Sequence, residues 1–130
     1  MHNLFFVAIG GALGSSLRYL FVEMVLTFQR SNQALLSFPL AITLANIFGS
    51  FLMGILHFYF VHNLDSISSQ TRLFLSVGVL GGFTTFSAFS LDVLRLINAG
   101  QLNLAFICVF SSVIFSILAI FAGFYLAKLM

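Results

Sequence analysis

The chain has 130 residues, of which 61% are hydrophobic and only 6% are charged, with a formal net charge of +2. A soluble domain of this length cannot bury so much apolar surface, so the composition predicts an all-α protein whose solvent is a lipid bilayer. The few basic residues form no stripe, which argues against nucleic acid as a partner. Because Cys108 is the single cysteine, a disulfide within one chain is excluded.

Apolar stretches of roughly 20 residues or more divide the chain into four predicted membrane-spanning helices. Their expected bounds are residues 3–27, 38–61, 72–97 and 102–126, which together form a single membrane domain. The connectors, residues 28–37, 62–71 and 98–101, are too short to hold a soluble domain. The first stretch lacks the basic region and small-residue cleavage site of a signal peptide, so we expect it to be retained as a span.

In the first span, Arg18 lies well inside the apolar stretch, where a charge is costly unless it faces water, an anion or a polar partner. Glu23 is a weak candidate partner, because a spacing of five residues is off-register on a helix. Snorkelling of both side chains to the interface is the alternative. On an anion pathway, Arg18 would supply attraction at the pore mouth.

The second span carries a polar face, since Thr43, Asn46, Ser50 and His57 recur at helical spacing. An amide in hydrocarbon must find hydrogen-bond partners, so Asn46 either holds helices together or contributes to a binding site. Both interpretations stay open for Asn46. His57 lies near the end of the span and is expected at the interface.

The third span contains three glycines within five residues, Gly78, Gly81 and Gly82. Glycine weakens a helix, so the sequence predicts that the third helix is broken at residues 78–82. The hydroxyl residues Thr84, Thr85, Ser87 and Ser90 follow. Irregular backbone survives within a bilayer only where it is buried in protein or lines a wet cavity, so the pattern indicates a permeation or binding site.

Phenylalanines recur every third residue after the glycines, at Phe83, Phe86 and Phe89. Ring edges carry positive partial charge and hydroxyls donate hydrogen bonds, so the two together suit a small anion. Simple packing of the rings and back-bonding of the hydroxyls are the alternatives. Asp92 and Arg95 are expected to pair at the end of this span, and Ser111, Ser112 and Ser116 add donors in the fourth.

Basic residues near the ends of the spans are evenly divided. Arg72 and Lys128 fall on one side of the membrane, and Arg30 and Arg95 fall on the other. The positive-inside rule therefore gives no preferred orientation, which favours dual topology and an antiparallel homodimer. The alternative is that short loops make the rule uninformative here. Small residues four apart in several spans predict close helix packing, and no particular function.

Three segments in order resemble the Fluc (CrcB) family of small fluoride channels. The first span resembles GGxxGAxxRY at residues 10–19, which read GGALGSSLRY. The second span resembles N-x-x-G-[ST]-F-x-x-G at residues 46–54, which read NIFGSFLMG. The third span resembles GGxTTFSTFS at residues 81–90, which read GGFTTFSAFS, with Ala88 in place of the family's second threonine. Asp92 stands where the family often has glutamate.

The resemblance implies an antiparallel, dual-topology homodimer in a bacterial-type inner (plasma) membrane, with two fluoride pores. It implies that Phe86 and Phe89 line the pores and that Asn46 donates a hydrogen bond there. It places Arg18 at the vestibule and a central Na⁺ on the backbone carbonyls of Gly81 and Thr84. The hydroxyls of a polar track would be those of Thr85, Ser87, Ser112 and Ser116.

The sequence thus predicts a passive fluoride-selective channel rather than an enzyme, since no nucleophile–base pair, metal-ligand cluster or phosphate loop is evident. Its main rival is a proton-coupled small multidrug exporter, which needs a carboxylate at the membrane midplane. Glu23 lies too near the helix end for that role, and the chain has no tryptophan for a cation site. An assembly adaptor would explain the small residues but not the glycine break and its hydroxyls.

Overall fold

Long helices make up nearly all of the computed structural model, which describes residues 2–32, 38–63 and 66–130. The unbroken ones are α1 (His2–Ser31), α2 (Leu40–His62) and α6 (Leu102–Leu129). Within the described ranges, four helical stretches are long and apolar enough to cross a membrane, so the predicted all-α, multi-pass architecture is confirmed. Parts of the predicted connectors, residues 33–37 and 64–65, lie outside the described residues.

The third span is assembled from four pieces. It begins with α3 (Ser69–Arg72), continues as the π-helix η2 (Leu73–Leu80) and the short α4 (Gly81–Phe83), and resumes as α5 (Phe86–Asn98). The prediction of a broken third helix is confirmed, since the π-helix η2 overlaps the predicted residues 78–82, and extended backbone follows just after them. Residues 78–82 remain helical, and the extended backbone lies at Thr84 (φ −80°, ψ 155°) and Thr85 (φ −154°, ψ 121°).

Two glycines of the third span, Gly78 and Gly82, serve contact with α1. A Cβ added at Gly78 would lie 2.8 Å from the Cα of Gly10, and one added at Gly82 would lie 2.8 Å from the carbonyl oxygen of Gly11. Neither distance leaves room for a side chain, so these glycines allow two backbones to touch. The π-helix η2 ends within this glycine-containing stretch. π-Helical turns are rare in proteins and often occur at functional sites.

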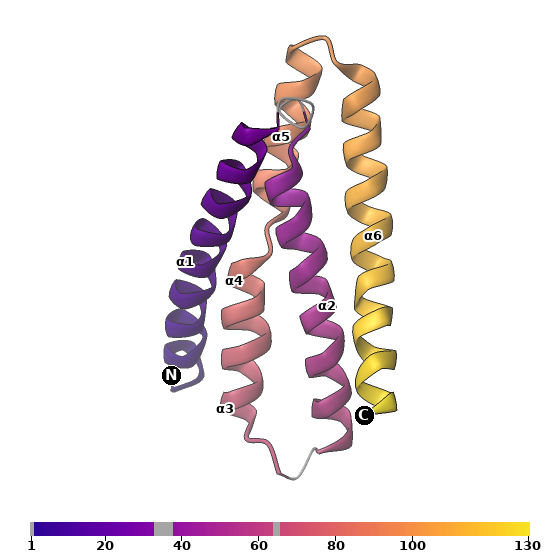
Figure 1. Cartoon of the computed structure of the whole chain (residues 1–130). Helices are drawn as coiled ribbons and strands as arrows, with labels where there is room; N and C mark the ends of the chain where they lie inside the picture. Colours follow the sequence, from indigo (N-terminus) through magenta and orange to yellow (C-terminus); the bar gives the residue numbers. More distant parts are fainter. Residues whose placement is uncertain (1, 33–37, 64–65) are drawn as a thin grey trace.

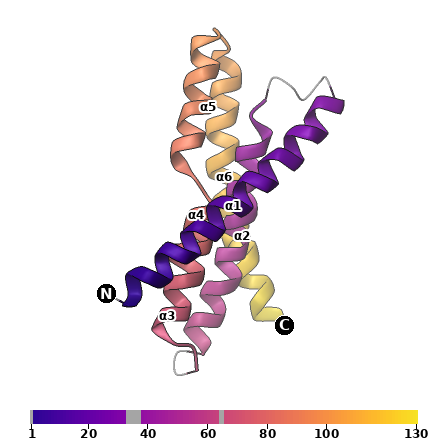
Figure 2. The ribbon, with the colours of Figure 1, turned by 90° about the vertical axis from the view of Figure 1, so that its left-hand side faces the viewer.

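Both termini lie at the same end of the bundle, as four spans require (Figure 1). Helices α2 and α6 run side by side, and α1 crosses the lower part of the third span obliquely (Figures 1 and 2). Arg72 ends α3 and Lys128 lies in the last turn of α6, whereas Arg30 and Arg95 lie in the last turns of α1 and α5. The basic residues are therefore divided between opposite ends, as predicted; dual topology itself stays a prediction.

Helices α2 and α6 meet along a seam of small residues. A Cβ at Gly54 would collide with the carbonyl oxygen of Ile120, and a Cβ at Gly123 would collide with that of Phe51. Above this seam, α5 and α6 enclose an apolar cluster made of Phe89, Leu96, Ala105 and Cys108. Cys108 is fully buried there, in agreement with its predicted role as a small hydrophobe.

Candidate functional site

A groove of about 350 Å³ lies between α2, α6 and the break in the third span. It brings together residues predicted from three separate stretches of sequence. The predicted pore residues that line it are Asn46, Thr85, Phe86, Phe89, Ser112 and Ser116. Ser87 joins them through its hydroxyl, which lies 3.2 Å from the Thr85 hydroxyl.

Asn46 holds the break by two hydrogen bonds to a single residue. Its Nδ2 donates to the carbonyl oxygen of Thr85 at 3.0 Å, and its Oδ1 accepts from the Thr85 backbone N–H at 2.8 Å. The side-chain Oδ1 thus replaces the Gly81 carbonyl that would accept the Thr85 N–H in a continuous helix, and Nδ2 adds a hydrogen bond to the Thr85 carbonyl. The interpretation of Asn46 as an interhelical link is confirmed. One hydrogen of its NH₂ group is used on Thr85, and the amide carries a second.

Thr85 also starts the next helix, because its side chain accepts a hydrogen bond from the N–H of Ala88 at 3.2 Å. Threonine is a favoured N-cap residue, since its hydroxyl satisfies an N–H that the first turn leaves without a backbone partner. The interruption therefore lies at Thr84–Thr85 because Asn46 and this cap both favour extended backbone there. The glycines three to seven residues earlier carry neither feature.

The three phenylalanines of the predicted stripe have different environments. Phe86 is 77% exposed, whereas Phe89 is 6% exposed, and their ring centroids are 5.5 Å apart. Phe83 points elsewhere and packs edge-on against Phe21 and Phe48 on α1 and α2. Only Phe86 and Phe89 belong to the groove.

A buried pair of hydroxyls lies beside the groove. Thr43 Oγ1 and Ser112 Oγ share a hydrogen bond of 3.0 Å, and both residues are buried. The sequence placed Thr43 on the polar face of the second span but gave no sign that Ser112 would be its partner. Ser111, by contrast, bonds back to the Cys108 carbonyl of its own helix and does not line the groove. His57 is exposed near Phe124, as expected for an interfacial residue.

Arg18 reaches the break from α1. Its Nη1 donates to the carbonyl oxygen of Thr84 at 3.2 Å, and the side chain is partly buried. The partner of Arg18 is thus a backbone carbonyl in the third span, and the weak pairing with Glu23 considered from the sequence is not the contact formed. This contact explains how a charge is accommodated well inside an apolar helix.

The carbonyls of Gly81 and Thr84 are among those that the break releases from helical hydrogen bonding. In a continuous helix, the Gly81 carbonyl would accept from Thr85 N–H, which bonds Asn46 instead. The Thr84 carbonyl would likewise accept from Ala88 N–H, which bonds the Thr85 hydroxyl. Freed carbonyl oxygens are suitable ligands for a hard cation such as Na⁺. The oxygens of Gly81 and Thr84 therefore fit the predicted cation chemistry.

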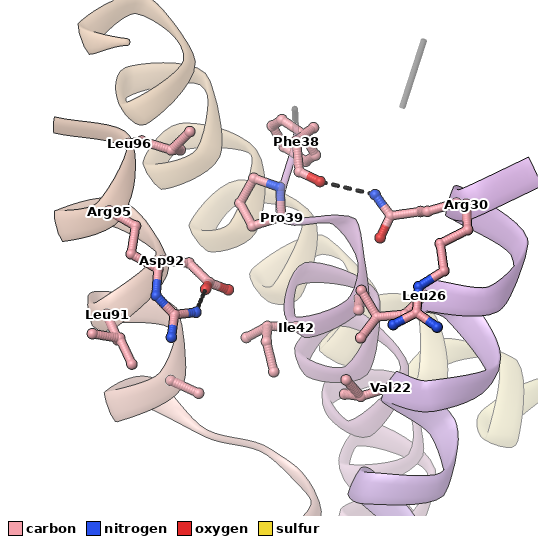
Figure 3. Close-up of a pocket in the computed structure, with 13 residues that line it drawn as sticks. Val22, Leu26, Arg30, Phe38, Pro39, Ile42, Leu91, Asp92, Arg95 and Leu96 are labelled. Atoms are coloured by element: carbon pink, nitrogen blue, oxygen red, sulfur yellow. Dashed lines mark hydrogen bonds and ion pairs between the residues drawn. The ribbon is translucent and has the colours of Figure 1, made fainter. Parts of the chain in front are cut away.

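A second, larger cleft of about 490 Å³ lies between α1, the start of α2 and α5 (Figure 3). It contains the predicted ion pair, in which Arg95 Nη1 lies 3.2 Å from Asp92 Oδ1. Its walls are mostly apolar, with Leu26, Ile42 and Leu91 among them, and none of the predicted pore residues lines it. The smaller groove, not this cleft, is the candidate site.

Comparison with known proteins gives matches over almost the full chain. The family model described as CrcB-like protein, Camphor Resistance (CrcB), matches residues 5–124. The "Fluoride-specific ion channel FluC" of Rhizobium meliloti (strain 1021) is 44% identical over 130 residues, which is 100% of this chain and 99% of the relative. The protein of the same name from Agrobacterium fabrum is 43% identical over 98% of each chain. "Fluoride-specific ion channel FluC 3" of Methanosarcina barkeri is 37% identical over 95% of this chain and 88% of the relative.

Proposed function

Because the chain belongs to the CrcB family of membrane channels, we propose that it conducts fluoride passively and selectively out of the cell across a bacterial-type inner (plasma) membrane. The observation that supports this most directly is the groove at the break in the third span. It joins exposed and buried phenylalanine rings to hydroxyl and amide groups in one place. No covalent chemistry is asked of any residue in it.

The groove suits a small anion through three kinds of donor. Ring edges of Phe86 and Phe89 carry positive partial charge, and the hydroxyls of Ser112 and Ser116 donate hydrogen bonds. The break also turns the N-terminus of α5 toward the groove, because Thr85 and Phe86 line it. A helix N-terminus carries partial positive charge and favours an anion. Together these groups can replace the water around fluoride, whereas a larger halide fits them less well.

A second copy of the chain completes the pathway in this proposal. Phe86 is 77% exposed although it lines the groove, so one wall of the path is missing in the single chain. The even division of basic residues between the two ends lets a second copy insert upside down with equal ease. An antiparallel homodimer would then contain two pores, each built from both subunits.

The freed carbonyls of Gly81 and Thr84 would hold a structural Na⁺ at the dimer centre. A bound Na⁺ would contribute fixed positive charge and join the two breaks. Asn46 supports such a site by keeping Thr85 N–H away from the Gly81 carbonyl, and Thr85 does so by keeping Ala88 N–H away from the Thr84 carbonyl.

A proton-coupled cation exporter fits the groove less well. Such an exporter needs a carboxylate in the pathway, and the residues that line the groove include no aspartate or glutamate. Glu23 lies on α1, which does not contribute to the groove, and Asp92 lies in the other cleft, where it is paired with Arg95.

Liposomes that contain the purified protein test the proposal through fluoride and chloride efflux, both followed with ion-selective electrodes. We expect rapid fluoride efflux with negligible chloride loss. Asn46→Asp should reduce fluoride efflux about 100-fold or more, because it removes the donor to Thr85 and adds a negative charge beside the path. Asn103→Asp makes the same change at an exposed position of α6 and should leave efflux unchanged. A folded protein that passes no fluoride, or passes both halides equally, would refute the proposal.

A further inference from the structure

The contact between Arg18 and Thr84 joins a residue expected at the vestibule to a carbonyl expected to bind Na⁺. The guanidinium donates to the Thr84 carbonyl oxygen at 3.2 Å. That oxygen is also one of the two proposed above to hold a cation. Two positively charged groups can therefore bind the same carbonyl oxygen: the guanidinium of Arg18 and a cation from solution.

Arg18 is held close to this oxygen by the packing of α1. At Gly14, four residues before Arg18, a Cβ would collide with the Val79 carbonyl, so the two backbones are in contact. About one turn earlier on α1, a Cβ added at Gly82 would lie 2.8 Å from the carbonyl oxygen of Gly11. Because Arg18 follows this contact on the same helix, its side chain is brought to the residues just after α4.

The partner of the guanidinium is neutral, so the contact does not cancel the charge of Arg18. A cation bound at the Thr84 carbonyl would meet that charge at short range. The Thr84 oxygen can stabilise the guanidinium or the cation well, but both together only at an electrostatic cost.

We propose that Arg18 is a positioning residue that competes with the cation for the Thr84 carbonyl oxygen. Without a cation, the guanidinium occupies this oxygen and keeps the break in shape. When a cation binds, the guanidinium is displaced from this oxygen. This inference rests on the proposed cation site, and it makes Arg18 the group that limits cation affinity.

A sodium titration of thermal stability tests the competition independently of fluoride flux. The full chain, purified in detergent, is melted at increasing NaCl, with choline chloride keeping the ionic strength constant. A ligand that binds the folded state raises the melting temperature, so the midpoint of the rise reports cation affinity. The variants are Arg18→Gln and Arg18→Met, the second of which suits an apolar helix if the first folds poorly. The control is Arg30→Gln, which removes the same charge from an exposed position of α1.

We expect the sodium midpoint of either Arg18 variant to fall about tenfold below that of the unmodified protein, because a like charge has gone from the site. Arg30→Gln should leave the midpoint unchanged. If Arg18 only supports the fold, its variants will melt lower at every sodium concentration with the same midpoint, and the inference is wrong. If the melting temperature of the unmodified protein does not change with sodium concentration, both the cation site and the competition are refuted. Fluoride efflux from liposomes would then test channel function independently of the cation site.

Discussion

Helices α2 and α6 form two very different contacts along their length. At Gly54 and Gly123 they touch backbone to backbone, with no space for a side chain. Beside this seam, Asn46 and Ser50 of α2 and Ser116 of α6 line an open groove. Small residues thus let the helices touch at the seam, and polar side chains of both helices line the groove. The seam should govern stability and the groove should govern conduction.

The largest effect is expected at the seam. Gly54→Val places a side chain against the Ile120 carbonyl, which cannot move without displacing α6, so we expect a loss of about 3 kcal/mol or more in unfolding free energy. Unfolding in SDS, followed by far-UV circular dichroism, measures it. Gly11→Val is the matched control, because a Cβ there meets nothing within 4 Å. Equal losses in both variants would show that glycine spacing, not the contact, matters.

The two groove phenylalanines should separate stability from conduction. Phe86→Ile removes a ring edge but keeps an apolar side chain, so fluoride efflux should fall about tenfold or more with unfolding free energy nearly unchanged. Phe89→Ile should reduce efflux similarly and also cost about 1 kcal/mol, because Phe89 packs against Leu96 and Cys108. Efflux from liposomes and SDS unfolding measure the two effects. Normal efflux in both variants would contradict the assignment of the rings to the pathway.

The smallest effect is expected from the buried hydroxyl pair. Thr43→Val removes the hydrogen bond to Ser112 while keeping the side-chain shape, so we expect a cost of about 1 kcal/mol and a fall in efflux of a few fold. Thr27→Val is the matched control, since Thr27 is exposed and its hydroxyl donates to the Glu23 carbonyl of its own helix. If both variants have the same free energy of unfolding, the Thr43–Ser112 hydrogen bond does not stabilise the contact between α2 and α6.

Sequence reasoning was most successful where local pattern controls structure. The apolar stretches gave the four spans, and the spacing of Asp92 and Arg95 gave their ion pair, because both follow from helix geometry within one segment. It did not predict the extended backbone at Thr84 and Thr85, because it judged the break by the helix propensity of glycine alone. The side chain that holds the extended backbone, Asn46, comes from another helix, and no local rule connects it to Thr85.

The sequence by itself determined that the chain is a four-span membrane protein with polar groups gathered near a weakened third helix. Composition and periodicity suffice for this, since lipid requires each span to satisfy its own backbone. Only the tertiary structure decided that Asn46 would hold Thr85, that Ser112 would find Thr43, and that Arg18 would reach Thr84. Each of these contacts joins residues far apart in the chain, and close packing at glycine contacts between helices sets which groups meet.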